Sequence, residues 1–245
     1  MKYCVFFLSL TISLTVALGG AAQTRLTNPA VVELYTSQGC GMCPPADALL
    51  AELAQHPNVL GLSLHITYWD YRGWTYWDYR GWRDPFSLPS ATARQEAYAA
   101  FAVYEYVYTP QFIVNGVHEF RNLRDPAVTE ALLNVGNASQ DMPLEIAWEG
   151  NRVVIAPLDT IPLPAPLALW RITFLHNAET QVTAGYNAGR ALVNQHIVTQ
   201  IEALEDWSGT DSRAVPLASS AEQGQALLVQ SAQNGAIWGA AALMP

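Results

Sequence analysis

The chain has 245 residues, of which 51% are hydrophobic and only 13% are charged, and its formal net charge at pH 7 is −9. This composition is typical of a folded protein with one large or two modest domains, and it excludes a largely disordered chain. Because nucleic acids and anionic lipid surfaces are bound mainly through Lys and Arg, the acidic charge also argues against both as partners.

The first residues have the pattern of a secretory signal peptide. Lys2 precedes an apolar run, Val5–Leu18, and small residues follow at Gly19–Ala22. The run is short for a membrane span, so residues 1–22 are the predicted signal peptide, with no stable membrane insertion after cleavage. The mature chain is therefore expected to be exported, as a periplasmic or secreted protein. Loss of Lys2 would change the net charge from −9 to −10.

Cys40 and Cys43 are the cysteines that would remain, because Cys4 would leave with the peptide. They stand between Ala30–Tyr35, a short apolar run that predicts a buried strand, and Ala46–Ala54, whose leucines are spaced as in a helix. An exported protein folds where disulfides can form. The sequence therefore predicts a strand, a C-x-x-C turn and a helix.

The start of the predicted helix favours a reactive thiolate on Cys40. Pro44 and Pro45 are tolerated in a first turn, where a missing N–H costs little. Unpaired N–H groups and the helix dipole there can lower a cysteine pKa from about 8.5 to between ~3.5 and ~7.5. Three alternatives remain for the pair. The context favours a redox-active dithiol over an inert local disulfide, or over a metal site that would need two more ligands from scattered histidines.

An aromatic insert at residues 67–86 follows the next predicted strand, Val59–Ile66. The unit TYWDYRGW occurs at Thr67–Trp74 and again, unchanged, at Thr75–Trp82, and it holds four of the eight tryptophans. Trp, Tyr and Arg dominate recognition surfaces, so the insert is a candidate partner-binding surface. Its candidate residues are Trp69, Asp70, Trp74, Trp77 and Trp82. The alternative is an aromatic loop folded over the domain, with the second copy bulging outward as a slippage product.

Four further elements complete the first half of the chain. The sequence predicts a helix at Ala91–Tyr104, then strands at Phe112–Val114 and Val117–Phe120 joined by Asn115–Gly116, a strong hairpin signal. A last helix is predicted at Arg124–Leu133.

The resulting order, β-α-β-insert-α-β-β-α, is that of a thioredoxin domain, and residues 23–136 resemble the thioredoxin superfamily. More closely, the chain is similar to a family of exported thioredoxin-like proteins of unknown function. The stretches that carry the resemblance are Glu33–Asp47 (ELYTSQGCGMCPPAD), the YWDY-x-GW-x-DPF stretch, Ala93–Gln95 and Tyr108–Gln111.

The resemblance implies roles for individual residues. Cys40 matches the nucleophilic cysteine, Cys43 the resolving cysteine, and Pro110 a cis-proline that faces them; Thr109 and Pro110 would position a partner chain. The sequence departs from the family in its second aromatic unit and at Thr67, where relatives usually carry an acid able to relay a proton. The implied activity is thiol–disulfide exchange with protein thiols or disulfides, without a cofactor.

After Gly136 the composition changes, and residues 137–245 are predicted as a smaller all-β, sandwich-like domain. The predicted strands are Leu144–Trp148, Arg152–Leu158, Leu167–Leu175, Gln181–Tyr186, Ala191–Gln200, Ala226–Ser231 and Ala236–Leu243. Asn187, Gly189 and Arg190 favour a tight strand connection over a binding loop.

Two functional hypotheses follow for this α/β thioredoxin-like domain and its β-rich companion. In the first, the protein is a thiol–disulfide oxidoreductase in which the Cys40 thiolate attacks a substrate disulfide and Cys43 resolves the mixed disulfide. In the second, it is a non-enzymatic binding or scaffold module with a structural Cys40–Cys43 disulfide. No oligomeric state is predicted.

Overall fold

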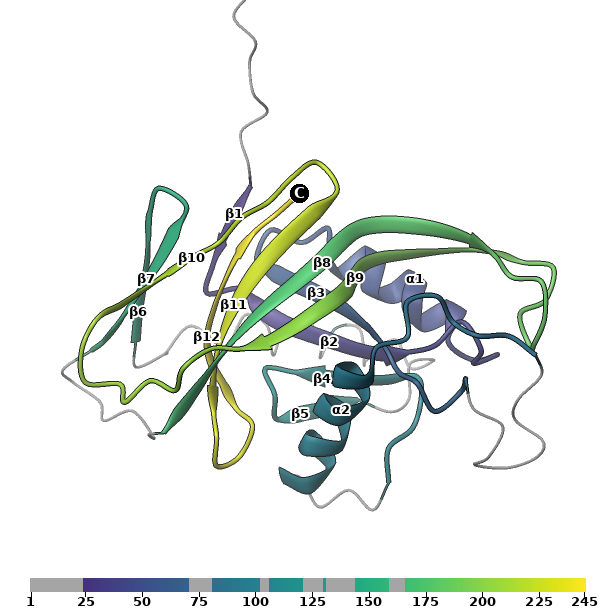
Figure 1. Ribbon diagram of the computed structural model, residues 1–245, viewed down its shortest axis with the longest axis horizontal. Coiled ribbons are helices and arrows are strands. Elements are labelled where there is room, and N and C mark those ends of the chain that lie inside the picture. The colour runs from purple at the N-terminus through teal and green to yellow at the C-terminus, as the bar shows by residue number, and fades with distance from the viewer. Residues whose placement is uncertain (1–23, 71–80, 102–105, 121–129, 131–143, 159–165) are drawn as a thin grey trace, which may run out of the picture.

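A computed structural model describes residues 24–70, 81–101, 106–120, 130, 144–158 and 166–245 (Figure 1). The predicted signal peptide, Trp74, Trp77, the predicted helix Arg124–Leu133 and the predicted domain boundary at Gly136 all lie outside this part, apart from Glu130. Among the described residues, no helix is long and apolar enough to cross a membrane.

A mixed nine-stranded sheet runs through the molecule in the order β1-β12-β11-β8-β9-β3-β2-β4-β5 (Figure 1). Its strands are β1 (Arg25–Thr27), β2 (Ala30–Thr36), β3 (Val59–His65), β4 (Gln111–Val114), β5 (His118–Phe120), β8 (Leu167–Gln181), β9 (Ala191–Ala203), β11 (Gln223–Ser231) and β12 (Ile237–Leu243). β2 and β3 pair in parallel, whereas β2 and β4 are antiparallel. The β4–β5 hairpin turns at Asn115 and Gly116, which both have positive φ, so this predicted turn is confirmed.

Two helices cover opposite faces of the first half of this sheet. Successive side chains of β2 point to opposite faces. Val32 and Leu34 pack with α1 (Pro44–Leu53), and Val31 and Tyr35 belong to the core that includes residues of α2 (Pro89–Phe101). The bounds of α1 and α2 lie within a few residues of the helices predicted at Ala46–Ala54 and Ala91–Tyr104.

The second half of the chain is all-β where it is described. A small sheet of β10 (Arg213–Pro216), β7 (Arg152–Pro157) and β6 (Leu144–Glu149) packs against β8, β11 and β12 as a second layer. The longer strands, however, do not form a self-contained sandwich. They continue the sheet of the first half, where Ser63 of β3 pairs with Ile197 of β9. This junction covers an edge of β3 whose N–H and C=O groups would otherwise be exposed.

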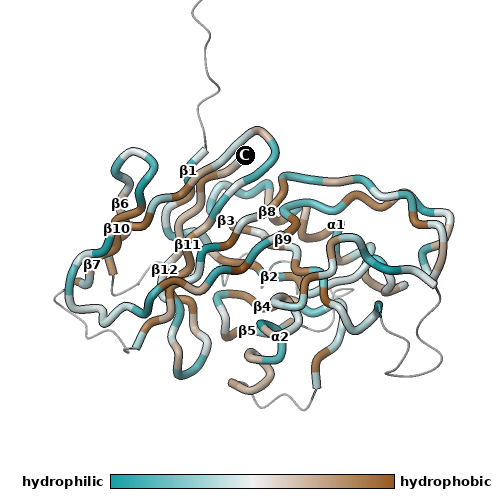
Figure 2. The backbone as a smooth tube through the Cα atoms, viewed as in Figure 1, coloured by the Kyte–Doolittle hydropathy of each residue, from teal (hydrophilic) through white to brown (hydrophobic). Residues whose placement is uncertain are grey.

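The core is continuous across this junction. Figure 2 shows hydrophobic stretches along strands from both halves of the chain. The largest cluster of buried residues combines Tyr35 and Leu62 of the first half with Ile172, Phe174 and Leu228 of the second. Because burial of apolar area stabilises a fold wherever the side chains come from, the two halves support each other.

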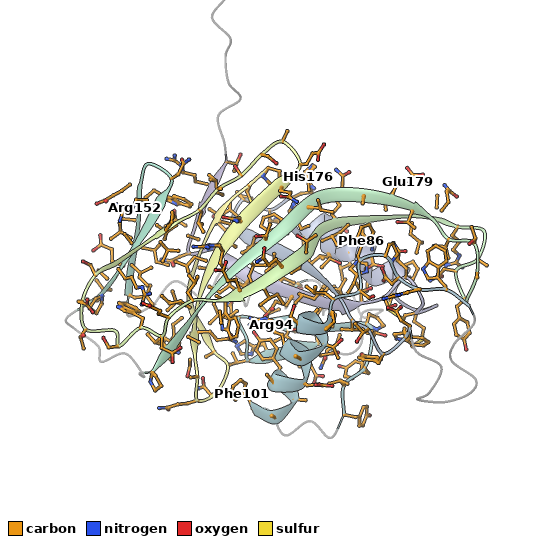
Figure 3. The ribbon with its side chains drawn as sticks, in the orientation of Figure 1. Phe86, Arg94, Phe101, Arg152, His176 and Glu179 are labelled. Atoms are coloured by element: carbon orange, nitrogen blue, oxygen red, sulfur yellow. A yellow bond between two sulfur atoms is a disulfide. The ribbon has the colours of Figure 1, made fainter. Side chains whose placement is uncertain are left out.

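Strands β8 and β9 form an arm that extends beyond the rest of the sheet. β8 pairs with β11 only as far as Leu175, but it pairs with β9 as far as Gln181. In Figure 1 this arm runs alongside α1, and Figure 3 shows Glu179 far along it. The strand predicted at Gln181–Tyr186 is wrong. Residues Val182–Arg190, the hairpin tip, instead turn the chain back through Gly185 and Gly189, both with positive φ.

Candidate functional site

Cys40 and Cys43 form a disulfide at the N-terminus of α1, with their Cα atoms 5.4 Å apart. Cys43 is the residue before the helix, and its carbonyl oxygen accepts the N–H groups of Ala46 and Asp47. The two cysteines are 1% and 0% exposed. Among the residues that the structure describes, no group of three or more His, Cys, Asp or Glu side chains could hold a metal ion.

Thr109 and Pro110 lie directly against this disulfide. The peptide bond between them is cis, as the resemblance implies, and it leads into β4. The Thr109 carbonyl oxygen is 3.9 Å from the Cys40 sulfur, a packing contact because a disulfide sulfur has no proton to donate. Trp69 Nε1 donates a hydrogen bond of 2.7 Å to Thr109 Oγ1. The structure thus brings the predicted residues Cys40, Cys43, Thr109 and Trp69 together around one sulfur pair.

The hairpin tip covers the same site from the second half of the chain. Asn187 is fully buried, and its Nδ2 atom donates 2.9 Å hydrogen bonds to the carbonyl oxygens of Gln38 and Cys40. Tyr186 packs edge-on against Trp69, with ring centroids 6.1 Å apart, and lies close over Gly41. Asn187 is part of a strand connection, as predicted, but its contact with the C-x-x-C turn was not foreseen. No local pattern signals a contact between such distant segments.

Two further residues of the aromatic insert, Asp70 and Trp82, contact neighbouring parts of the fold. Asp70 Oδ1 accepts the Asp84 N–H at 3.0 Å, and Trp82 lies against Gly185 of the hairpin tip. Trp69 and Trp82 are both partly buried. In this conformation Trp69 contacts the site and Trp82 contacts the hairpin tip that covers it. Their role in binding a partner stays a prediction.

A buried acid lies one helical turn beyond Cys43, although Thr67 stands at the position expected to carry one. Asp47 Oδ1 accepts a 2.8 Å hydrogen bond from Thr36 Oγ1, and the Asp47 N–H binds the Cys43 carbonyl oxygen. Burial raises the pKa of Asp47 to about 6, and the charge of His65 and the Thr36 hydrogen bond oppose part of that rise. This carboxyl therefore titrates close to neutral pH.

A buried pair, His65 and Asp84, is bound to the turn through the backbone of Gln38. His65 Nδ1 lies 2.7 Å from Asp84 Oδ2, and that carboxylate also accepts the Gln38 N–H at 2.7 Å and the Phe86 N–H at 2.9 Å. Burial disfavours the imidazolium, but the Asp84 charge and hydrogen bond outweigh it and raise the pKa of His65. Burial alone would raise the pKa of Asp84, but the charge and hydrogen bond of His65 hold that pKa below its ordinary value. Both shifts favour the ionic form of the pair, and Asp84 fixes Gln38, two residues before Cys40.

Comparison with protein families decides where this chain belongs. Residues 31–75 and 75–230 match the family described as "Protein of unknown function (DUF1223)". The chain belongs to the DUF1223 family. The match restarts at Thr75, the first residue of the second TYWDYRGW unit, which agrees with the expectation that the family has this unit once.

Two solved structures share the fold of this DUF1223 protein. The crystal structure of protein AGR_C_4864 from Agrobacterium tumefaciens is 27% identical in sequence, with a TM-score of 0.63, and the match covers 88% of this chain and 93% of that one. HBP35 of Porphyromonas gingivalis is 17% identical, with a TM-score of 0.59 and coverage of 89% and 76%, so it shows likeness of fold alone. A search of curated proteins finds no match.

Asp47→Asn is expected to stabilise this DUF1223 protein at alkaline pH. The folded carboxyl holds its proton up to a pKa of about 6, against 3.8 ordinarily, so wild-type stability falls as pH rises through that window and is level above it. At ~1.4 kcal/mol per pKa unit, the variant should gain about 2–3 kcal/mol at pH 8 and almost nothing at pH 4. Urea unfolding across pH measures this. The control is Glu52→Gln, an exposed carboxylate on the same helix. A gain that does not vary with pH would contradict the assignment.

Proposed function

We propose that this DUF1223 protein is an exported thiol–disulfide oxidoreductase whose dithiol is Cys40 and Cys43, carried by a thioredoxin-like first half. One observation supports this above the others. The Cys40 sulfur stands at a helix N-terminus and contacts the Thr109 carbonyl that precedes cis-Pro110, a residue from a distant element. The helix N-terminus stabilises a thiolate, and the Thr109–Pro110 backbone beside it would align a partner chain once the cover over the site has moved.

The proposed reaction is a two-step exchange. In the reduced protein the Cys40 thiolate attacks one sulfur of a substrate disulfide, forming a mixed disulfide and releasing the other substrate sulfur as a thiolate. The Cys43 thiolate then attacks the Cys40 sulfur, which releases the second substrate thiolate and forms the Cys40–Cys43 bond. Two electrons pass from the protein dithiol to the substrate, and the two cysteine protons end on the substrate thiols. A dithiol partner drives the same steps in reverse.

Burial of both sulfurs favours a second candidate function. A disulfide this well covered is protected from thiols, as is usual for structural disulfides in exported proteins. In that case the disulfide would hold the turn, and the aromatic insert and the β-rich half would bind a partner.

Cys43→Ala is expected to accumulate mixed disulfides between Cys40 and exported proteins, because the resolving thiolate is gone. Gel electrophoresis with and without reductant, followed by mass spectrometry, detects them. The matched control is Cys40→Ala, which lacks the attacking sulfur and should form few adducts. A reduction potential below about −300 mV in glutathione buffers, together with no adducts from Cys43→Ala, would reject the oxidoreductase and support the structural disulfide.

A further inference from the structure

The hairpin tip makes several independent contacts with the C-x-x-C turn. Asn187 binds the Gln38 and Cys40 carbonyl oxygens, and Tyr186 covers Gly41 and Trp69. The Gln38 side chain adds a second attachment point lower on the arm. Its Nε2 atom donates 3.1 Å hydrogen bonds to Thr180 Oγ1 of β8 and to Asn194 Oδ1 of β9. The turn is therefore bound to both strands as well as to the tip.

These contacts leave the two sulfurs inaccessible while the rim of the turn stays in solvent. Both cysteines are buried, yet Met42 between them is 68% exposed. A thiolate must approach the Cys40 sulfur along the S–S axis to exchange. The Thr109 carbonyl contacts that sulfur, and the Trp69 and Tyr186 side chains lie over the neighbouring residues Gly39 and Gly41. Because Cys40 is buried, a partner reaches the sulfur only if part of this cover moves.

The tip is the part of this cover best able to move. Beyond Leu175, β8 has left β11, and the arm continues as a two-stranded ribbon. A two-stranded ribbon is marginally stable by itself, so the position of the tip depends on its contacts with the turn, and such a segment opens at a lower free-energy cost than the core of the sheet. Most tip residues other than Val182 and Asn187 are exposed or partly exposed. By contrast, Thr109 is fixed in the chain between α2 and β4, and Trp69 is bonded to it.

We propose that the hairpin tip is a gate on the Cys40–Cys43 disulfide, with Asn187 as the residue that holds it closed and Tyr186 as the residue that blocks approach to Cys40. This rests on the proposed function in that it regulates the same dithiol. When the tip lifts, a partner gains the space between Tyr186 and Thr109, and the exchange proceeds at Cys40. The tip therefore favours partners with an extended segment, which can enter that space, and disfavours partners that present only a folded surface.

The experiment measures how fast the disulfide of the intact protein is reduced by two probes, dithiothreitol and a reduced protein dithiol, thioredoxin. A probe thiolate attacks the Cys40 sulfur and expels the Cys43 thiolate; the second probe thiol then attacks the mixed disulfide, leaving oxidised probe and reduced protein. Asn187→Ala removes both hydrogen bonds of the tip to the turn, each with a typical net strength of about 1 kcal/mol, and should therefore accelerate reduction by about thirtyfold. Tyr186→Ala should accelerate it too, more for the bulky protein probe than for dithiothreitol.

Val193→Ala, an exposed residue on the same arm, is the matched control and should leave both rates unchanged. Unfolding free energies separate gating from general destabilisation: should Asn187→Ala fail to fold, Tyr186→Ala decides, because its ring is partly exposed. Equal rates for wild type and both folded variants would overturn the gate. That result is distinct from failure of the proposed function, which the reduction potential and Cys43→Ala trapping measure without reference to the tip.

Discussion

Arg94→Met is expected to lower the free energy of unfolding by about 3–5 kcal/mol, because it leaves Glu33 as an unpaired buried charge. Arg94 Nε and Nη2 donate to the two Glu33 carboxylate oxygens at 2.6 and 3.2 Å, and both side chains are buried. Arg94 also binds Gln230 of β11 and the Tyr98 hydroxyl. Figure 3 labels Arg94 on α2, so the pair ties α2 to β2 and to the second half of the sheet. Such a loss is a large part of typical domain stability, and urea unfolding would measure it.

Two comparison variants sharpen this expectation. Arg171→Met breaks a 3.0 Å pair with Glu202 that is partly exposed, and it should cost at most about 1 kcal/mol. The double variant Glu33→Gln/Arg94→Met removes both charges and should recover much of the loss. A single-variant loss no greater than that of Arg171→Met would show that Glu33 is solvated.

Asp84→Asn is expected to destabilise the protein by about 3–5 kcal/mol near pH 5.5, and by less at alkaline pH. The raised pKa of His65 means that its contribution is complete below about 6.5 and is lost as pH rises through the folded value. The lowered pKa of Asp84 means that its contribution is present above 3.8 and is lost as pH falls through the folded value. The pair therefore stabilises most between these limits.

Urea unfolding of wild type and Asp84→Asn from pH 4 to pH 9 tests this dependence. Asp211→Asn, an exposed carboxylate, is the control and should change stability little at any pH. Gln38 and Phe86 bind different Asp84 oxygens, so the asparagine keeps an acceptor for only one of these N–H groups. That loss does not depend on pH, so the pH-dependent part of the difference reports on the His65 charge. A difference that stays constant across the series would mean that His65 is neutral in the folded protein.

The sequence predicted the local features of the site well. The strand before Cys40, the prolines that start α1 and the Asn115–Gly116 turn all follow from short-range backbone preferences, and the structure has each of them. The cis bond before Pro110 came only from the resemblance, since spacing does not encode it.

The long-range features were out of reach for physical reasons. The buried ion pair of Glu33 depends on Arg94, which lies 61 residues away in the sequence. Asn187 contacts Cys40 across 147 residues of sequence. Asp47 lies within the quoted motif, but nothing in that motif shows that its carboxyl is buried. The Asn187 contact depends on how β9 joins β3, and a one-dimensional pattern does not record that junction.

The position of β12 bears on how the molecule is assembled. This strand, the last in the chain, lies between β1 and β11, and the Met244 N–H binds the Thr24 carbonyl oxygen, so the two ends of the described chain meet. Because proteins are synthesised from the N-terminus, β1 can pair with β12 only after β12 has been made, late in synthesis. Deletion of β12 would therefore remove a strand from inside the sheet and leave β1 without its neighbour.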